Sequence, residues 1–539
     1  MPEMSDLIIP PADRHGPSTR RDMGNIPTEL TGPDFTTGVP LDLIADESML
    51  QGHAFGSHVL LVRHASRFVA IGAHCTHYGV ALVDGTVADG QLRCPLHHAC
   101  FNLENGAAAR APAFDALARW QTDVRDGLVY VTEQIEASPP RVIPPAPDET
   151  PGMVIVGGGA AGNAAAEMLR TEGYDGPITL VSAEANVPVD RPNFSKGTIA
   201  GTVPHAYNFL RRQEFYSDRR IALRLGARVE RIDAGAREIL LADGERLAYE
   251  KLLLATGADP IRLDTPGADL PHVHTIRSLS DSEAVASQAA TAKSAVVIGA
   301  SFIGMEAAAA LRSRGIDVHV VAPDDIPMAR VLGNDVGIFM RQLHEHHGVT
   351  FHLGTTVATI EVGRVTLATG ATLAADVVVM GVGVRPTVTL AASAGLAVDN
   401  GVMVNAYLET SAAHIYAAGD IARWPDPHTG TLMRVEHWVV AERQGQTAAR
   451  NMLGRQEVFD AVPFFWTEQY DLTLSYVGHA ERGFTTSISG SLDIAHPDFR
   501  VDYTMDETIV AVATVNRDRE SLAAELALEQ MRPPARVRQ

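Results

Sequence analysis

Residues 153–162 read Met-Val-Ile-Val-Gly-Gly-Gly-Ala-Ala-Gly, and this stretch decides the architecture of the larger part of the chain. Its apolar residues predict a buried strand, and the Ala-rich run that follows predicts a helix ending before Gly173. Gly157, Gly159 and Gly162 lie at the junction in the Gly-x-Gly-x-x-Gly spacing. At such a turn the backbone can approach a pyrophosphate, which the unpaired N–H groups of the helix N-terminus stabilise. The stretch therefore predicts a dinucleotide-binding α/β unit.

A second unit repeats this order of strand, glycine turn and helix. Its turn begins 142 residues later, at 299 instead of 157, and reads Gly-Ala-Ser-Phe-Ile-Gly. Gly299 and Gly304 keep two of the glycines, and Ser301 is small enough to leave the backbone open to a ligand. An acidic residue follows the next strand in each unit, Glu184 in the first and Asp324 in the second. The sequence therefore predicts two Rossmann-like dinucleotide-binding domains.

A Pro-rich segment separates these units from the N-terminal part of the chain. Prolines at this density favour an extended spacer. Short apolar runs separated by Gly and Asp predict an all-β domain before it, and aromatic-rich strands predict an α+β domain at the C-terminus. The predicted multidomain order is an N-terminal extension (1–39), the all-β domain (40–136), a linker (137–151), the first dinucleotide-binding domain (152–265 and 385–454), the second (266–384) and the C-terminal domain (455–539).

Two short loops in the all-β domain carry residues with metal-ligand chemistry. They read Cys75-Thr-His77 and Cys94-Pro-Leu-His97. Two thiolates for one iron and two imidazoles for the other make the ligand set of a Rieske [2Fe–2S] centre. Tetrahedral zinc accepts the same four residues, although zinc fingers usually pair Cys with Cys and His with His. The third interpretation is a pair of loops with packed cysteines and surface histidines.

The residues around these loops resemble the Rieske ferredoxin family. Gly79 follows the first loop, and Phe-Asn-Leu-Glu-Asn-Gly at 101–106 follows the second. The resemblance implies a [2Fe–2S] cluster held by the two Cys and the two His. Cys100 lies outside the ligand spacing and is predicted to be a small buried hydrophobe. His98 stands where relatives mostly have Gly, and its effect on the cluster is left open.

The cluster is expected to have a low reduction potential for its class. High-potential relatives carry an extra disulfide between the loops and a Ser and a Tyr that donate hydrogen bonds. At the corresponding positions this chain has Val80 and Leu96, Ala99, and Phe101. Because fewer donors stabilise the added electron, we expect a potential toward the reducing end of the Rieske range.

Further segments resemble the flavoprotein reductases that bind two dinucleotides, over about residues 152 to 539. These segments are Val-Asp-Arg-Pro at 189–192 with Ser195 and Lys196, Ala255-Thr-Gly257, and Ile-Tyr-Ala-Ala-Gly-Asp at 415–420. The resemblance implies FAD, contacted by Gly157, Gly159, Gly162, Glu184, Arg191, Lys196, Ala255, Gly257, Gly419 and Asp420, with Lys196 near the isoalloxazine as a catalytic residue. Taken singly, Asp190 and Arg191 could form a surface ion pair and Asp420 a helix cap. Their order along the chain favours the family.

The second glycine turn has the form found in apoptosis-inducing-factor-like reductases. The resemblance implies a nicotinamide dinucleotide site with Gly299, Ser301, Gly304, Glu306, Asp324 and Gly383. In that family Glu306 binds the nicotinamide carboxamide and is assigned as catalytic; a helix-surface Glu is the alternative. Asp324, with no Arg immediately after it, disfavours a 2′-phosphate and so favours NADH over NADPH, although Ala322 occupies the usual acidic position. Trp438 and Trp466 are assigned to the flavin, with ordinary core packing as the alternative.

The net charge, the lack of a long apolar stretch and the lack of further cysteines argue against several other functions. The formal charge of −21 disfavours nucleic acid as a partner. No apolar stretch reaches the roughly 18 to 20 residues of a membrane span, and the N-terminus lacks a secretory signal, so we expect a cytoplasmic protein. No cysteine follows Cys100, which excludes disulfide reductase chemistry. His344-Glu-His346-His347 is interpreted as a cationic, polar helix end rather than a mononuclear iron site.

These features predict an NADH-dependent flavoprotein ferredoxin reductase. Electrons would pass from NADH through FAD and the cluster to an external one-electron acceptor, such as an oxygenase or a cytochrome P450. The linker is expected to let the Rieske domain swing toward its client. The alternative is an apoptosis-inducing-factor-like NADH-sensing interaction protein with slow turnover. The oligomeric state is left open between a monomer and a homodimer.

Overall fold

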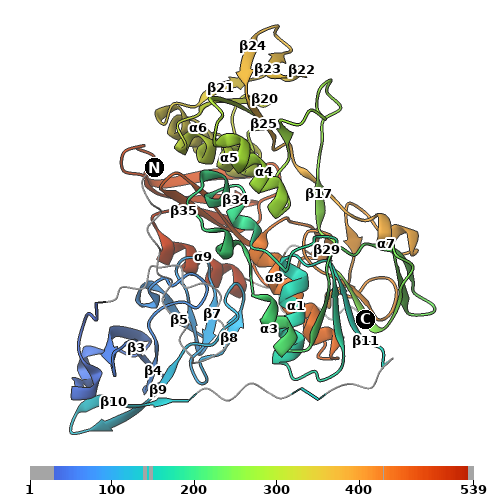
Figure 1. The fold of residues 1–539 in the computed structure, drawn as a ribbon. Helices are drawn as coiled ribbons and strands as arrows, with labels where there is room; N and C mark the ends of the chain where they lie inside the picture. The colour runs from blue at the N-terminus through green and yellow to red at the C-terminus, as the bar shows by residue number, and fades with distance from the viewer. Residues whose placement is uncertain (1–28, 137–142, 145–149, 429, 532–539) are drawn as a thin grey trace, which may run out of the picture.

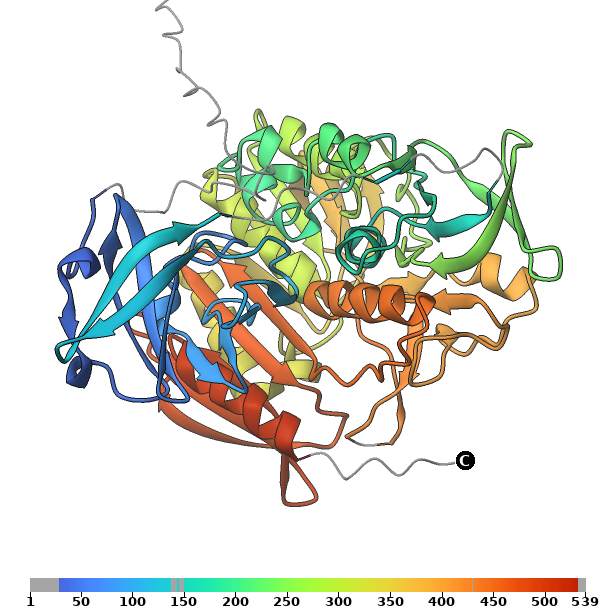
Figure 2. The ribbon, with the colours of Figure 1, turned by 90° about the horizontal axis from the view of Figure 1, so that it is seen from below.

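The computed structural model describes residues 29–136, 143–144, 150–428 and 430–531. Most of the predicted N-terminal extension and Pro-rich linker, and the last eight residues, lie outside these ranges. The predicted fold class is confirmed: an all-β domain precedes two parallel α/β sheets and a C-terminal α+β domain. Figures 1 and 2 show the all-β domain, in blue, beside the red C-terminal domain. No helix within the described ranges is long and apolar enough to cross a membrane.

The all-β domain consists of two antiparallel sheets. The six-stranded sheet has the order β1-β10-β9-β4-β3-β2, with β1 (Val39–Pro40), β2 (Ser48–Ala54), β3 (Ser57–His64), β4 (Arg67–Gly72), β9 (Arg119–Arg125) and β10 (Leu128–Ile135). The four-stranded sheet has the order β5-β6-β7-β8, with β5 (Thr86–Ala88), β6 (Gln91–Arg93), β7 (Cys100–Asn102) and β8 (Ala108–Arg110). Alternate residues of β3 serve two cores: Leu60 and Val62 pack toward the Cys and His loops, and Val59 and Leu61 pack on the opposite face.

The first α/β domain forms around the stretch that opens the glycine turn. Its parallel strands have the order β13-β12-β11-β16-β28, and β14 and β15 add antiparallel strands beyond β16. The elements are β11 (Gly152–Val156), α1 (Ala160–Thr171), β12 (Ile178–Val181), β13 (Ile221–Arg224), β14 (Val229–Asp233), β15 (Glu238–Leu241), β16 (Arg246–Leu254), β28 (Ile415–Ala417) and α8 (Trp438–Met452). Helix α8 crosses α1 closely, because a Cβ at Gly445 would lie 2.2 Å from the Ala161 carbonyl oxygen.

The second α/β domain has a five-stranded parallel sheet of order β18-β25-β19-β20-β21. Its elements are β18 (Val273–His274), α4 (Leu279–Ala289), β19 (Ser294–Ile298), α5 (Phe302–Ser313), β20 (Asp317–Ala322), α6 (Ala329–His346), β21 (Thr350–Leu353) and β25 (Val377–Met380), with a separate sheet of β22 (Val357–Glu361), β23 (Gly363–Leu367) and β24 (Thr372–Ala375). Strands β17 (Ala258–Pro260) and β26 (Val384–Pro386) pair where the chain passes between the two α/β domains.

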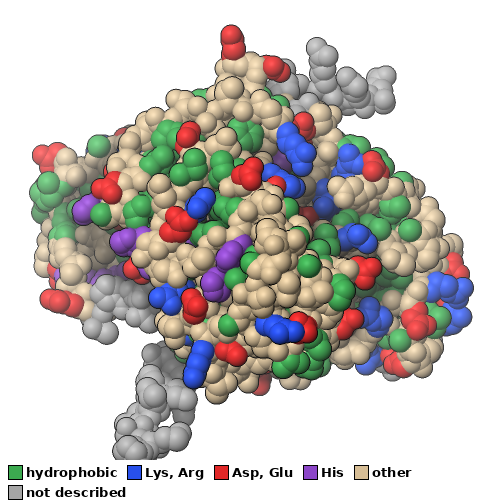
Figure 3. Space-filling model, turned by 90° about the horizontal axis from the view of Figure 1, so that it is seen from above, with side chains coloured by type: hydrophobic (Ala, Val, Ile, Leu, Met, Phe, Trp, Pro, Cys, Tyr) green, Lys and Arg blue, Asp and Glu red, His purple; other side chains and the backbone are tan. Residues whose placement is uncertain are grey.

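The C-terminal domain is a five-stranded antiparallel sheet with one long helix. Its strands have the order β31-β32-β35-β34-β33, with β31 (Phe464–Gln469), β32 (Leu472–Gly478), β33 (Thr485–Ser491), β34 (Asp498–Met505), β35 (Thr508–Val515) and the helix α9 (Asp518–Gln530). Shorter elements are α2 (Gly197–Ala200), α3 (Gln213–Asp218), α7 (Thr389–Ser393), β27 (Val402–Met403), β29 (Ala422–Pro425) and β30 (Leu432–Met433). Figure 3 shows acidic and basic side chains interspersed over the face seen from above.

The histidines at the end of α6 differ from the sequence prediction. His344 is fully buried and bonds Gln469 through Nε2, with 2.6 Å between the ring nitrogen and Oε1. Burial lowers the pKa of His344 to about 4, so its ring is neutral. The prediction of a cationic helix end is therefore wrong for His344, because β31 covers it.

His344 is expected to make stability depend on pH. Its pKa is about 4 in the folded chain and about 6.5 in an unfolded one, so the stabilisation is complete above pH 6.5 and is lost as pH falls toward 4. The full loss is roughly 3 kcal/mol. We expect the apparent Tm of the wild type to fall more steeply between pH 7 and 4 than that of His344→Gln, which cannot titrate. Parallel curves would contradict this assignment.

Candidate functional site

Both predicted glycine turns have the geometry that excludes a larger residue. A Cβ at Gly162 would lie 1.9 Å from the carbonyl oxygen of Gly157, and Gly157 itself has φ +115°. In the second turn, a Cβ at Gly304 would lie 2.2 Å from the carbonyl oxygen of Gly299, which has φ +107°. Each strand and helix can therefore meet closely only because these positions lack a side chain. The backbone at both helix N-termini is left accessible to a phosphate.

The two turns open on one cavity of about 500 Å³ between the α/β domains and β31. A cavity of this size is typical of cofactor sites. Twelve predicted residues line it: Gly159, Arg191, Lys196, Ala255, Gly257, Ser301, Glu306, Gly383, Gly419, Asp420, Trp438 and Trp466. Gly157, Gly162, Gly299 and Gly304 shape the turns behind the lining, and Glu184 and Asp324 lie outside it. The structure thus brings most of the predicted dinucleotide residues together.

Three arginines line the cavity, each beside an acidic residue. Arg191 bonds Glu184 at 2.5 Å, and Arg277 bonds Asp420 at 3.1 Å. Arg434 bonds the Asp420 carbonyl oxygen at 3.0 Å. Arg277 was not predicted, since no motif spacing places it beside the glycine turns. Guanidinium groups in this position suit the pyrophosphate of a dinucleotide.

Several buried donors in the cavity lack a hydrogen-bond partner. Among the described residues that line it, these include Arg191 Nε, Arg434 Nε and His437 Nδ1, and the unpartnered Gln444 Nε2 belongs to a residue outside the lining. The other end of the Gln444 amide is occupied, since its Oε1 accepts from the Gly419 N–H at 2.7 Å. Buried polar atoms are normally paired, so these donors are available to a bound ligand with acceptor oxygens and nitrogens. This donor set fits a dinucleotide such as FAD.

Glu306 lies at the centre of a buried polar cluster. Its carboxylate bonds Ser195 Oγ at 2.5 Å, Thr467 Oγ1 at 2.7 Å and Lys196 Nζ at 2.9 Å. Ser195 and Lys196 follow the segment 189–192 that resembles FAD-binding sequences, and Thr467 belongs to β31. The helix-surface alternative for Glu306 is wrong, because only 4% of the residue is exposed. Glu306 and Lys196 therefore hold each other at the cavity wall where the three domains meet.

Asp324 lies at the surface and is already paired. Its Oδ1 accepts from Arg330 Nη2 at 2.6 Å. Arg330 lies six residues after Asp324 and is brought to it by the start of α6, so the residues immediately after Asp324 did not reveal this pair. The acidic residue and the arginine thus lie together beside the second unit.

The cluster loops converge as two like pairs. Cys75 and Cys94 lie in one buried cluster, and the Nδ1 atoms of His77 and His97 approach to 3.2 Å. All four residues are buried. Burial lowers the pKa of His97 to about 3, which keeps it a neutral ligand. Sulfur beside sulfur and nitrogen beside nitrogen suits two irons with different ligands better than one zinc ion.

The two loops also share one backbone pattern. The N–H of Cys75 donates to Val80 and that of Cys94 to Ala99, both at 2.8 Å. The N–H groups of the residues two and three positions after each cysteine donate to its sulfur. Such amide donors are typical around iron–sulfur clusters and stabilise the added electron. The described cysteines are all free, and Cys100 is fully buried as predicted.

The histidine side of the cluster site contacts the cavity wall. Trp466, which lines the cavity, lies with its ring centroid 4.0 Å from that of His97. Tyr78 stacks on His77 at 3.8 Å and donates to Asp190 Oδ2 at 2.7 Å. Trp466 therefore contacts both the cavity and the cluster loops, so its position is not explained by core packing alone. The Rieske domain is docked against the reductase in this structure.

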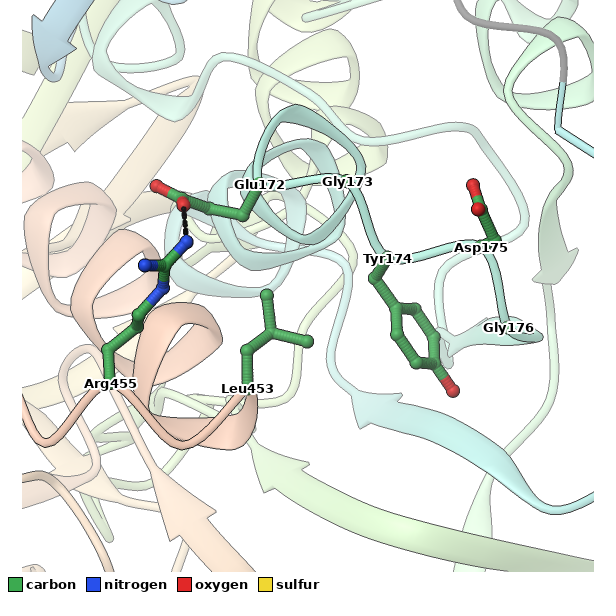
Figure 4. Close-up of a pocket in the computed structure, with 7 residues that line it drawn as sticks. All are labelled: Glu172, Gly173, Tyr174, Asp175, Gly176, Leu453 and Arg455. Carbon is green, nitrogen blue, oxygen red and sulfur yellow. Dashed lines mark hydrogen bonds and ion pairs between the residues drawn. The ribbon is translucent and has the colours of Figure 1, made fainter.

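A separate hollow lies at the C-terminal end of α1, as Figure 4 shows. Glu172 pairs there with Arg455 at 3.1 Å, and Tyr174 and Leu453 complete the wall. None of the predicted site residues lines this hollow. It carries no part of the site described above.

Comparison with known proteins matches three families along the chain. The Rieske [2Fe-2S] domain matches residues 39–121, pyridine nucleotide-disulphide oxidoreductase matches 151–445, and the reductase C-terminal domain matches 464–538. Apoptosis-inducing factor 3 from Homo sapiens is 33% identical over 85% of this chain and 78% of its own length. Rhodocoxin reductase from Rhodococcus erythropolis is 40% identical over 69% of this chain and 88% of its own.

Solved structures agree with these relatives. The covalent putidaredoxin reductase–putidaredoxin complex matches with a TM-score of 0.68 and 32% identity, over 71% of this chain and 93% of that one. A ferredoxin reductase from Rhodopseudomonas palustris matches with a TM-score of 0.68 and 34% identity, over 72% and 96%. Rieske, FAD and NAD chemistry therefore occur together in one electron-transfer oxidoreductase. The chain belongs to the pyridine nucleotide-disulphide oxidoreductase family, as an NAD(P)H-dependent ferredoxin reductase that carries its own Rieske domain.

Proposed function

We propose that this protein passes electrons from NADH through FAD to its own Rieske cluster, and from there to an external one-electron acceptor. The observation that carries the proposal is the contact of Trp466 with His97, which joins the dinucleotide cavity to the cluster loops. FAD accepts a hydride and can release electrons singly, and the cluster carries one at a time. The acceptor is proposed to be an oxygenase or a cytochrome P450.

The chain's residues would position and insulate these groups. Arg191, Asp420 and the first glycine turn would hold FAD, the second glycine turn would hold NADH, and Cys75, His77, Cys94 and His97 would hold the cluster. Lys196 and Glu306 would keep a fixed charge pair beside the isoalloxazine and nicotinamide. Trp466 and the buried loops would exclude water between the two sites. In the domain boundaries proposed from the sequence, the cluster ligands belong to residues 40–136, and Arg191 and Asp420 belong to the FAD-binding domain of residues 152–265 and 385–454.

Names of the relatives support the acceptor class. One relative is an anthranilate 1,2-dioxygenase system ferredoxin–NAD⁺ reductase component, and another is putidaredoxin reductase. Neither relative matches the whole of this chain, because the matches cover 69% and 68% of it. The proposal here is that the fused Rieske domain takes the place of a separate ferredoxin.

Spectra of the purified protein test the proposal. We expect flavin and [2Fe–2S] absorbance, iron and acid-labile sulfide, and bleaching of both chromophores on addition of NADH. NADPH should be at least about tenfold less effective, because Asp324 repels a 2′-phosphate and Arg330 is already paired. A flavoprotein without iron and sulfide would contradict the proposal. Flavin that stays reduced with every one-electron acceptor would favour the NADH-sensing alternative.

A further inference from the structure

A buried ionic network joins the Rieske domain to the reductase. It consists of Arg93, His98 and Arg110 from the Rieske domain, Arg443 from α8, and Glu525 and Glu529 from α9, and we call it the docking network. His98 Nδ1 lies 3.0 Å from Glu525 Oε2, and Arg443 Nη1 lies 2.8 Å from Glu525 Oε1. Glu529 accepts from Arg93 at 2.8 Å and from Arg110 at 2.5 Å. Three charged segments far apart in sequence therefore meet at one interface.

Burial makes this network different from a surface ion pair. His98 and Glu525 are 0% exposed, and Arg93 and Arg443 are nearly so. Removing one partner from a buried charge network leaves the others unpaired in a low-dielectric environment, which is strongly destabilising. At the same interface Arg519 pairs with Asp84 at 3.2 Å, but both side chains are more than two-thirds exposed. Exposed pairs of this kind contribute little.

The backbone of His98 adopts a left-handed conformation. His98 has φ +58°, and its N–H donates to the Cys94 carbonyl oxygen at 3.2 Å. Gly79 holds the equivalent place in the first loop, with φ +72° and its N–H donating to Cys75. The loop geometry thus demands a left-handed residue at both places, which glycine adopts without strain and other residues adopt at a cost.

All polar groups of the His98 side chain point to the reductase. Besides Glu525, its Nε2 lies 3.2 Å from Ser521 Oγ. Its ring stacks on Phe464 of β31 at 4.2 Å, and its carbonyl oxygen accepts from Arg443 at 3.0 Å. Phe464 is two residues from Trp466, whose ring contacts the neighbouring His97. One strand of the reductase therefore touches two successive residues of the second cluster loop.

We propose that His98 is a positioning residue, which locks the second cluster loop onto α9 and β31 so that His97 stays against Trp466. In this proposal, the cluster receives its electron while the Rieske domain is docked. The role in electron delivery rests on the proposed function, whereas the docking itself does not.

The test uses the full-length holoprotein and its variants His98→Gly, Glu525→Gln and Arg519→Ala. His98→Gly suits the positive φ and leaves the loop backbone unstrained, so iron content should stay at the wild-type value. Glu525→Gln breaks the network from the reductase side without touching the loop. Arg519→Ala removes an exposed interface pair and serves as the matched control.

Stopped-flow spectroscopy and small-angle X-ray scattering give separate readouts. In His98→Gly and Glu525→Gln we expect unchanged flavin bleaching by NADH, at least about tenfold slower bleaching of the cluster, and a larger radius of gyration. Arg519→Ala should match the wild type in all three. Wild-type scattering and cluster bleaching in both lock variants would overturn the proposal, and so would loss of iron in His98→Gly. If NADH does not bleach the cluster even in the wild type, the proposed function is contradicted. Expanded scattering of the two lock variants would still support the lock in that case.

Discussion

Replacing Cys94 with serine is expected to lower NADH-driven cytochrome c reduction at least about a hundredfold, while NADH still bleaches the flavin at close to the wild-type rate. Cys94 is one of the two buried thiols of the cluster site, and its sulfur accepts backbone hydrogen bonds from the loop. Serine offers a hydroxyl that is a poor iron ligand, so the cluster should be lost or altered. The flavin segments lie in another domain and do not depend on this residue.

Cys100→Ala supplies the control for this variant. Cys100 is as buried as Cys94 and lies six residues further along the chain, but its sulfur lies outside the Cys and His pairs. We expect it to keep its iron and its cytochrome c reduction. Full cytochrome c reduction by Cys94→Ser would show that electrons leave the flavin by a route that bypasses the cluster.

Gly162→Val is expected to yield protein with less than about a tenth of the wild-type flavin content. The new Cβ would lie 1.9 Å from the Gly157 carbonyl oxygen, so β11 and α1 must move apart. Overpacking of this kind costs roughly 1 to 3 kcal/mol or more, and it also distorts the turn that meets the pyrophosphate. Flavin absorbance per protein, measured after purification and after incubation with FAD, checks the result.

Gly235→Ala is the matched glycine control. Gly235 lies in the exposed turn between β14 and β15 of the same domain, and a Cβ there would meet only the Asp233 side chain, at 3.5 Å. We expect normal flavin content in this variant. Normal flavin content in Gly162→Val would mean that the first glycine turn is not the flavin site.

The sequence predicted those parts of the site whose chemistry is local. A strand, a glycine turn and a helix lie next to each other in the chain, so their spacing alone identifies the unit. The Cys and His loops are equally local, and each is closed by its own backbone hydrogen bonds. These features of the fold and of the ligand set required no knowledge of distant contacts.

Contacts between domains could not be predicted in this way. Arg277 reaches Asp420 across 143 residues of sequence, and His98 reaches Glu525 across 427. The role left open for His98 depends on α9, which is folded from the far end of the chain. His344 was misjudged for the same reason, because Gln469 of β31 buries a helix end that would otherwise face solvent. Spacing carries no information about such partners.

The docked Rieske domain also has a consequence for stoichiometry. Reductases that rely on a separate carrier must meet it by diffusion, so their turnover depends on how much of each protein the cell synthesises. On the route proposed here, translation of one messenger would deliver donor and carrier in a fixed one-to-one ratio, and the first electron transfer would be unimolecular. Dilution of the purified protein should therefore leave this internal step unchanged and slow only the encounter with the final acceptor.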